Sequence, residues 1–200
     1  AIATAAKLEQ CNKDRQKYTE TIVVEARQMI AAQPGKKIYL LAGEGWSPGV
    51  VGIVAGKFAN EYGVPVFVFG KDGDRYVGSG RSIPGFNVVK GMEQAKEFLS
   101  RFGGHPQACG LTIIGQENFA GFCASIERYA EEILHDVDLR PTIMIAAELR
   151  LGQITWELVD WLEKFEPFGE GNPRPKFLLR DVSVVAKDAV GKTAKHLRLK

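Results

Sequence analysis

The 200-residue sequence has few cysteines and no long apolar run. The three cysteines, Cys11, Cys109 and Cys123, form neither a Cys-x-x-Cys pair nor a zinc-binding pattern, which favours a reduced, cytoplasmic protein over a disulfide-linked one. No stretch reaches the roughly 18 consecutive apolar residues of a membrane-spanning helix. The first residues do not form a secretion signal. We therefore expect a cytoplasmic protein that does not bind a membrane.

The sequence also lacks a set of residues that could cleave a phosphodiester on its own. Metal-dependent hydrolysis needs several Asp and His ligands that converge on one or two cations. His135 lies beside Asp136 and Asp138, but this cluster is in an acidic stretch and is interpreted as the end of a surface helix. Asp72 and Asp74 fall in a turn with no histidine nearby. No Ser-His-Asp or Cys-His pattern is recognisable, so the residues predict that the chain binds an anion and holds no metal.

The net charge is only +2 at neutral pH, but the charges are unevenly distributed. Basic residues outnumber acidic ones in residues 1–116 and 171–200, whereas acidic residues dominate residues 117–170. Two basic regions around an acidic one are compatible with a polyanion that touches two separate surfaces. A solvated surface with chance clustering gives the same distribution, so charge alone leaves both interpretations open.

Apolar periodicity predicts an α/β domain with a mixed sheet in the first two thirds of the chain. A long helix is expected at residues 3–33, where Pro34 and Gly35 end the pattern. Short apolar runs that predict strands then alternate with amphipathic runs that predict helices. The expected strands cover residues 37–42, 65–69, 75–79 and 111–114, and the expected helices cover residues 50–62, 88–100 and 118–135.

The pattern changes after Asp138, where a small β domain is predicted. A segment rich in proline and glycine at residues 166–175 is interpreted as a rigid bridge into it. The other expected elements are a strand at 141–150, a helix at 154–165, and paired strands at 177–186 and 196–199 around a turn at 187–192. We therefore divide the chain into a long linking helix at 1–34, an α/β domain at 35–138, and a connecting segment with a partial β domain at 139–200.

The run Gly-Ser-Gly-Arg-Ser at residues 78–82 is the first candidate for anion binding. It is expected to leave the strand at 75–79, where glycines allow a ligand to approach the backbone closely. Backbone N–H groups and the hydroxyls of Ser79 and Ser82 could donate to phosphate oxygens, and Arg81 could bind the same phosphate with two hydrogen bonds. A glycine-rich turn with an exposed arginine is the alternative.

The run Phe-Gly-Gly-His at residues 102–105 is the second candidate, and we expect it between a helix and a strand. Gly103 and Gly104 let the backbone turn sharply, so that the imidazole of His105 could be held toward a phosphate or a metal-bound ligand. An ordinary loop histidine is the alternative.

Three further segments are weaker candidates. Residues 44–52 lead into a helix whose N-terminus could hold an anion, although a tight strand–helix connection also explains them. On the long helix, Asn12 and Arg15 share one face, which is equally well a solvated surface. Basic residues that could follow a nucleic-acid backbone lie near or beyond the Pro/Gly segment: Arg174, Lys176, Arg180 and Lys195.

Taken together, these segments resemble the RecJ branch of the DHH phosphoesterase superfamily, in the family's order and over nearly all of the chain. Those that carry the resemblance are Asn-Lys-Asp-Arg-Gln at 12–16, Gly-Val-Val-Gly-Ile-Val-Ala at 49–55, Gly-Ser-Gly-Arg-Ser at 78–82, Phe-Gly-Gly-His at 102–105 and Glu-Pro-Phe-Gly-Glu-Gly-Asn-Pro at 166–173. The Gly-Gly-His element marks DHH-associated domains in general. The 78–82 run and the Pro/Gly bridge narrow the resemblance to RecJ.

The resemblance implies a mixed-sheet DHH-associated domain after the long helix, followed by a partial OB-type β domain. It implies that the full-length protein degrades single-stranded DNA from the 5′ end in recombination and repair. A DHH domain that would precede residue 1 would bind the Mn or Mg ion, so these 200 residues are expected to be inactive alone. Single-stranded DNA is the implied partner, together with a single-strand-binding protein or a helicase, and the full-length protein is expected to be a monomer.

The resemblance also assigns roles to residues. Residues that would line a cleft and hold phosphates near the metal centre are Ser79, Gly80, Arg81, Ser82, Gly103 and Gly104, with His105 as an auxiliary catalytic group. Arg15 would lie on the helix that joins the two domains. Arg174, Lys176, Arg180 and Lys195 would contact the strand from the β domain.

Two features are expected to depart from the family pattern. Ser47 follows Trp46 where relatives commonly have a histidine, and the β domain is expected to be cut short at Lys200. Two alternatives remain: a non-catalytic DHH-family scaffold that binds DNA, and a DHH phosphoesterase that acts on short oligonucleotides.

Overall fold

The computed structural model describes residues 2–140, 142–169, 171–191 and 196–200, and the chain forms two compact units. Unit 1 is Ala1–Pro141 and unit 2 is Thr142–Lys200. Each unit is described by itself below. No helix in the described ranges is long and apolar enough to cross a membrane.

Unit 1 is built on a five-stranded mixed sheet with the strand order β1-β2-β3-β5-β4. The strands are β1 (Tyr39–Glu44), β2 (Val66–Asp72), β3 (Arg75–Arg81), β4 (Arg101–His105) and β5 (Ala108–Ile114). β1 and β2 are parallel, and the other neighbouring pairs are antiparallel. The predicted α/β class with a mixed sheet is therefore confirmed, with β3 in the middle and β4 at one edge.

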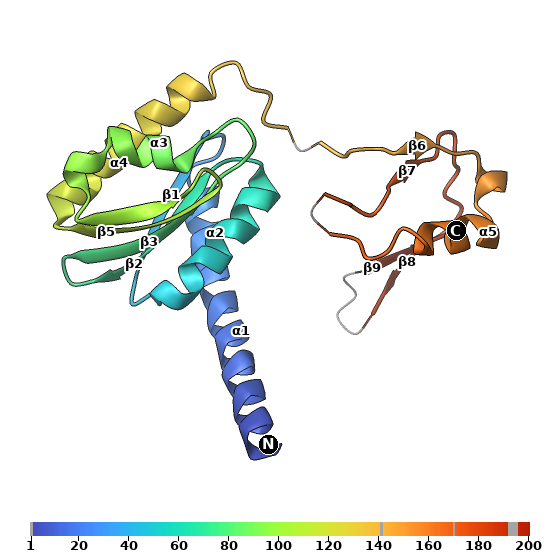
Figure 1. The fold of residues 1–200 in the computed structure, drawn as a ribbon, viewed down its shortest axis with the longest axis horizontal. Helices are drawn as coiled ribbons and strands as arrows, with labels where there is room; N and C mark the ends of the chain where they lie inside the picture. The colour runs from blue at the N-terminus through green and yellow to red at the C-terminus, as the bar shows by residue number, and fades with distance from the viewer. Residues whose placement is uncertain (1, 141, 170, 192–195) are drawn as a thin grey trace. The chain divides into compact units, whose positions relative to one another are not determined.

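Helices cover both faces of this sheet (Figure 1). They are α1 (Ile2–Ala31), α2 (Pro48–Tyr62), α3 (Val88–Gln94), α4 (Gln116–Ile133) and the short 3-10 helix η1 (Lys96–Phe98). Alternation along β2 explains the two layers, because successive side chains of a strand point to opposite faces. Val66 and Val68 pack with α1 and α2, whereas Phe67 and Phe69 pack with α3 and α4.

The two helices on the Val66 face are fixed by local sequence signals. Ser47 caps the N-terminus of α2 by accepting a hydrogen bond from Gly49 N, and Gly63, with a φ of 68°, ends the helix in the left-handed conformation. The buried residues of α1 recur at helical spacing in its second half: Ile22, Val23, Ala26 and Ile30. Its first half is exposed to solvent and extends beyond the sheet (Figure 1).

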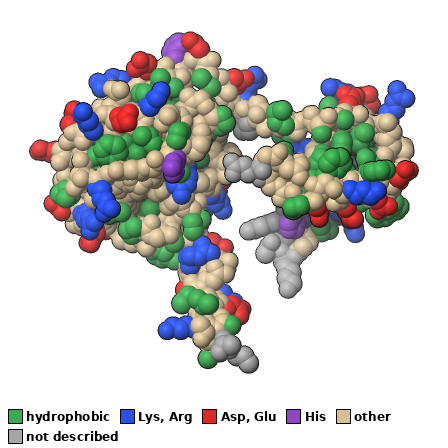
Figure 2. Space-filling view, viewed as in Figure 1, with side chains coloured by type: hydrophobic (Ala, Val, Ile, Leu, Met, Phe, Trp, Pro, Cys, Tyr) green, Lys and Arg blue, Asp and Glu red, His purple; other side chains and the backbone are tan. Residues whose placement is uncertain are grey.

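Unit 2 contains short elements and no buried side chain among its described residues. The elements are β6 (Ala147–Glu148), the 3-10 helix η2 (Leu151–Gln153), α5 (Trp156–Glu163), β7 (Phe177–Leu178), β8 (Lys187–Val190) and β9 (His196–Leu199). β6 pairs with β7 in parallel, and β8 pairs with β9 in antiparallel orientation. Apolar side chains consequently gather on the surface of this unit (Figure 2).

Several sequence predictions in unit 1 were wrong in detail. The Gly-Gly-His run is part of β4 and not a loop. Backbone pairing with β5 holds it in the sheet, although its side chains show no apolar pattern that would predict a strand. β3 continues to Arg81, so the 78–82 run lies mostly within a strand rather than after one. The helix expected at 88–100 ends at Gln94, since the backbone leaves the helical region at Ala95.

In unit 2 the strand predicted at 196–199 is confirmed as β9, but two other strand predictions were wrong in extent. Within 142–150, the described part of the strand expected at 141–150, residues 147–148 form β6, and within the strand expected at 177–186, residues 177–178 form β7. The partner of β9 is β8, which lies where a turn was expected. The chain instead reverses after β8, where Gly191 has a φ of 92° that favours glycine.

Candidate functional site

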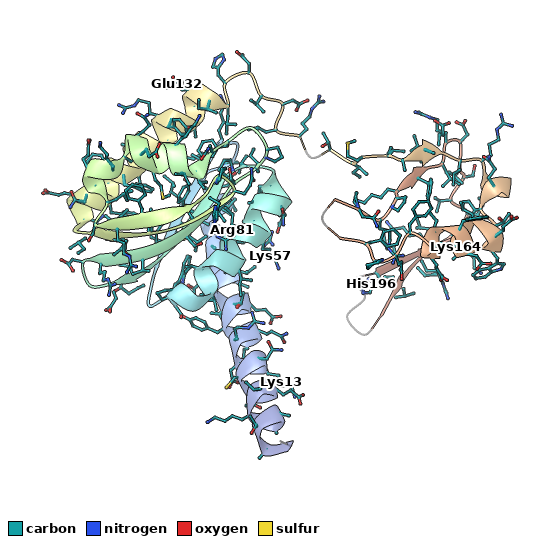
Figure 3. The ribbon with its side chains drawn as sticks, in the orientation of Figure 1. Lys13, Lys57, Arg81, Glu132, Lys164 and His196 are labelled. Atoms are coloured by element: carbon teal, nitrogen blue, oxygen red, sulfur yellow. The ribbon has the colours of Figure 1, made fainter. Side chains whose placement is uncertain are left out.

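Arg81 is the last residue of β3, and its side chain lies on the face of the sheet that α2 covers (Figure 3). Its Nη1 donates to Ser79 Oγ at 2.7 Å and to the carbonyl oxygen of Gly80 at 2.9 Å. Within the described part of the chain, all hydrogen bonds of this guanidinium run through Nη1. The N–H groups on Nε and Nη2 therefore have no hydrogen-bond partner among the described residues, and two such donors match two phosphate oxygens.

The hydroxyls of the two serines of the motif both donate to backbone carbonyl oxygens. Ser79 Oγ donates to the carbonyl oxygen of Cys109 at 2.9 Å, and Ser82 Oγ donates to the carbonyl oxygen of Phe86 at 2.6 Å. Each hydroxyl has a single proton, so neither can donate to a ligand without giving up its bond within the protein. Ser79 instead uses its lone pair to accept from Arg81.

Gly80 faces away from Arg81, toward the layer of α3 and α4. A Cβ atom at this position would lie 2.6 Å from Phe67 Cε1 and 2.7 Å from Cys109 Sγ. Glycine is therefore required here by packing between the sheet and its core. Burial raises the pKa of the neighbouring Cys109 thiol to about 12, so this sulfur is neutral and does not act as a nucleophile.

The strand register brings Arg81 and His105 into one row across the sheet. Both residues pair with Ala108 of β5, Arg81 from β3 and His105 from β4. Two strand spacings separate their backbones, which corresponds to roughly 10 Å. A bound nucleotide is long enough to reach both side chains.

The two glycines before His105 have different surroundings. A Cβ atom on Gly103 would meet nothing within 4 Å, and this residue is exposed. A Cβ atom on Gly104 would collide with the backbone of β5, lying 2.7 Å from Cys109 Cα. Glycine at position 104 therefore allows β4 to approach β5 closely and fixes the backbone that carries the exposed His105.

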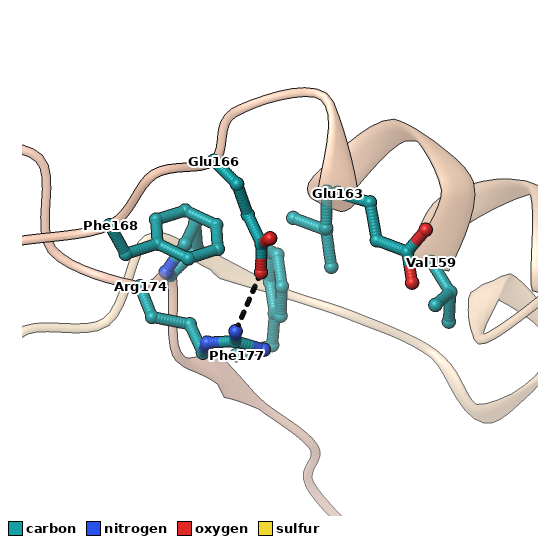
Figure 4. A pocket seen from close by; sticks show the side chains of 8 residues that line it. Val159, Glu163, Glu166, Phe168, Arg174 and Phe177 are labelled. Carbon is teal, nitrogen blue, oxygen red and sulfur yellow. Dashed lines mark hydrogen bonds and ion pairs between the residues drawn. The ribbon is translucent and has the colours of Figure 1, made fainter. Parts of the chain in front are cut away.

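The other predicted site residues that the structure describes belong to other elements of the two units. Arg15, on the exposed half of α1, donates to Asn12 Oδ1 at 2.8 Å. In unit 2, Arg174 forms an ion pair with Glu166 at 2.9 Å and lies 4.8 Å from the ring centre of Phe168 (Figure 4). Arg180 pairs with Glu148 at 2.9 Å. Lys176 is exposed, and Lys195 lies outside the described residues.

The Glu166–Arg174 pair lies at a pocket within unit 2 that has a volume of about 420 Å³ (Figure 4). Its lining mixes apolar and charged side chains: Val159, Leu162, Glu163, Glu166, Phe168, Arg174, Pro175 and Phe177. The guanidinium of Arg174 is held by a carboxylate and an aromatic face, so a nucleic-acid phosphate would have to compete with Glu166 for it.

No group of three or more His, Cys, Asp or Glu side chains is placed to hold a metal ion in the ranges that the structure describes. His135 Nδ1 lies 2.8 Å from Asp136 Oδ1 on an exposed surface. Asp138 is bound by Arg140, and this guanidinium lowers the pKa of the Asp138 carboxyl.

Comparisons with known proteins match each of the two units to a domain family. The DHHA1 domain family matches residues 34–132, and the RecJ OB domain family matches residues 145–200. The single-stranded-DNA-specific exonuclease RecJ of Bacillus subtilis is 31% identical over 198 residues, which is 98% of this chain. The chain belongs to the RecJ family. The resemblance to RecJ that the sequence motifs predict is therefore confirmed.

Other relatives support the same assignment. RecJ of Thermus thermophilus is 33% identical over 90% of the chain. The crystal structure of RecJ in complex with Mn2+ from Thermus thermophilus is similar with a TM-score of 0.81 and 28% identity, over 99% of this chain and 29% of that chain. The corresponding Mg2+ complex has a TM-score of 0.80. The chain spans about a quarter of the length of the Bacillus and Thermus RecJ sequences.

Sequence reasoning did not connect two glycines of α2 with the Arg81 site. Gly52 and Gly56 of α2 lie against the Arg81 side chain. Their spacing of four residues puts them on one face of the helix, and this spacing is visible in the sequence. Nothing in the sequence alone indicated that this face meets Arg81.

Proposed function

We propose that this chain is the substrate-binding part of a metal-dependent exonuclease that degrades single-stranded DNA from the 5′ end in recombination and repair. Arg81 binds a backbone phosphate through Nε and Nη2, and His105 contacts the same nucleotide from the neighbouring edge of the sheet. Support comes from the relatives named as single-stranded-DNA-specific exonucleases and from the shared row of Arg81 and His105. The row is the observation that carries the proposal.

We further propose that the catalytic ion, Mg or Mn as in the two Thermus crystal structures, is held by another part of the full-length protein. The DHH domain that the family resemblance implies would supply its ligands. These 200 residues would then position the strand while the chemistry takes place elsewhere. Assayed alone with Mn, the purified chain should show no robust turnover of a labelled single strand.

Unit 2 and the long helix are assigned secondary roles in this proposal. Lys176 and Lys195 contact the backbone of the strand, with Arg174 and Arg180 available when they leave their carboxylate partners. Arg15 acts from the helix at residues 1–34, which links the α/β domain at 35–138 to the metal-bearing part. The full-length protein works as a monomer in the cytoplasm, with a single-strand-binding protein or a helicase as partner.

The decisive test is Arg81→Ala in the full-length protein that contains these residues. The exposed Arg128 of α4, on the opposite side of the sheet, provides a matched Arg128→Ala control. Loss of one positioned donor should lower kcat/KM on 5′-phosphorylated single-stranded DNA by about 10²-fold, while the control keeps the wild-type rate. Wild-type activity in Arg81→Ala would remove Arg81 from the site.

Salt dependence separates this proposal from an enzyme for short oligonucleotides. Counterion release makes log K fall with log salt by about 0.7 per phosphate contacted on a single strand. A long strand that contacts both units should give a steeper slope than a dinucleotide. Equal slopes for the two ligands would favour the short-substrate alternative.

A further inference from the structure

We propose that Gly52 of α2 is a positioning residue for Arg81, an inference that rests on the proposed function. Gly52 touches no ligand in this role. It leaves the space in which the guanidinium lies, and Ser79 holds the guanidinium in that space.

The clearance between α2 and Arg81 defines the role. A Cβ atom on Gly52 would lie 2.9 Å from Arg81 Nη2, 3.1 Å from Ser79 Oγ and 3.5 Å from Arg81 Cζ. One turn further along the helix, a Cβ atom on Gly56 would lie 3.8 Å from Arg81 Cγ. The arginine side chain therefore runs along the helix from Gly56 to Gly52, and its charged end fits only because position 52 has no side chain.

The hydrogen bonds then fix the orientation of the guanidinium. Nη1 is held by Ser79 Oγ and by the Gly80 carbonyl oxygen, and Ser79 Oγ is itself anchored to the carbonyl oxygen of Cys109 on β5. A planar guanidinium with one fixed edge has a defined direction for its other donors. The orientation of this plane therefore determines whether Nε and Nη2 can donate to two oxygens of one phosphate.

Gly52→Ala is a sharp probe because it displaces the ligand-binding group and little else. The atoms it would crowd belong to the end of a flexible side chain and to a hydroxyl, so Arg81 can move without disturbing the core. Alanine also has a higher helix propensity than glycine. The variant should therefore fold with an unchanged or higher Tm while Arg81 is pushed out of place.

Gly56→Ala is the matched control. It makes the same change on the same helix, with the same gain in propensity, but its methyl group would make an ordinary van der Waals contact with Arg81 Cγ. Any effect of helix stiffness appears in both variants, whereas displacement of the guanidinium appears only in Gly52→Ala.

The experiment measures kcat/KM of the full-length protein on 5′-phosphorylated single-stranded DNA for both glycine variants, alone and combined with Arg81→Ala. Misplacing a positioning group by about 1 Å can cost on the order of 10²-fold, so Gly52→Ala should approach the loss caused by Arg81→Ala, and Gly56→Ala should stay near wild type. In the Arg81→Ala background, Gly52→Ala should have no further effect, because its target is gone.

A second readout is independent of activity. In the 200-residue chain labelled with ¹⁵N-arginine, the Arg81 Nε–H resonance should shift in Gly52→Ala and stay in place in Gly56→Ala. A Gly52→Ala protein with wild-type kcat/KM and an unshifted resonance overturns the proposal. So does a Gly52→Ala loss that persists undiminished in the Arg81→Ala background. If Arg81→Ala alone has no effect on kcat/KM, the proposed function of Arg81 fails, and the resonance shift still decides whether Gly52 positions this side chain.

Discussion

The two units differ most in where they keep their apolar side chains. In unit 1, each face of the sheet carries its own buried cluster, and large side chains such as Phe58 and Phe122 are fully buried. In unit 2, none of the described residues is buried, and Trp156 and Leu151 are 84% and 69% exposed. Because removal of apolar surface from water is the main favourable contribution to folding, unit 1 has an internal source of stability that the described part of unit 2 lacks.

The same difference applies to the candidate binding residues. Arg81 lies on a packed sheet, between a strand and a helix that are both fixed by the core. Arg174 is held by one carboxylate and one aromatic ring on an exposed segment. Rigid supporting elements keep a binding group within the narrow range of geometry that recognition needs. We therefore expect unit 1 to recognise one phosphate specifically and unit 2 to contribute charge with little geometric selectivity.

The largest expected difference between the units comes from removing an aromatic side chain. Phe122 of α4 is fully buried, with its ring centre 5.8 Å from those of Phe67 and Phe69. Phe122→Ala should therefore lower the free energy of unfolding by about 3–5 kcal/mol. Urea denaturation followed by circular dichroism measures this change in the free energy of unfolding.

The unit 2 counterpart, Trp161→Ala, removes a larger ring that is 54% exposed. It should change the free energy of unfolding by less than about 1 kcal/mol. Similar losses in both variants would show that unit 2 has a core of its own.

The next largest effect on stability is expected from adding one methyl group instead of removing a side chain. Gly80→Ala places a Cβ atom against Phe67 and the Cys109 sulfur, both buried. Overpacking of this kind should lower the free energy of unfolding by about 1–3 kcal/mol. Gly152 of unit 2 has nothing within 4 Å of its Cβ position, so Gly152→Ala should stay within about 0.5 kcal/mol of wild type. A neutral Gly80→Ala in the same urea titration would contradict the tight packing between β3 and β5.

The sequence was most informative where local periodicity and packing agree. The long helix, α2 and α4 were predicted within a few residues, because their apolar positions repeat at helical spacing and because Gly63 ends α2. The strands β1 and β2 were found from apolar runs of the kind that buried strands require. All of these elements lie in unit 1, where the core that produces such patterns exists.

Prediction failed where backbone pairing, and not side-chain pattern, determines the structure. β4 contains two adjacent glycines and no buried residue, so its sequence carries no alternation that predicts a strand. In unit 2 the strands are two to four residues long and unburied, so β8 had no signal to distinguish it from a turn. For the candidate site, the sequence singled out Arg81 and His105 as hypotheses, but their common row depends on the β3-β5-β4 register, which connects residues far apart in the chain.

The smallest expected effect concerns ion pairs on the surface of the two units. Arg27 of α1 pairs with Glu61 of α2, and this hydrogen-bonded guanidinium lowers the pKa of the Glu61 carboxyl below its usual value of 4.5. A carboxyl whose pKa is lower in the folded protein stabilises the fold above its usual pKa, and this contribution is lost as the pH falls through the lowered value. Both side chains are about 40% exposed, so the contribution should not exceed about 1 kcal/mol.

Glu61→Gln should therefore lower the urea midpoint at pH 7, and its difference from wild type should shrink in acid as the wild-type carboxylate is itself protonated. In unit 2, Glu148→Gln breaks the pair with Arg180, whose side chains are 65% and 54% exposed, and solvent screening should make its effect at pH 7 smaller still. A Glu61→Gln difference that is as large at pH 3 as at pH 7 would mean that the side chain contributes through packing and not through its charge. In that case the charge of the Arg27–Glu61 pair would add nothing to the stability advantage of unit 1.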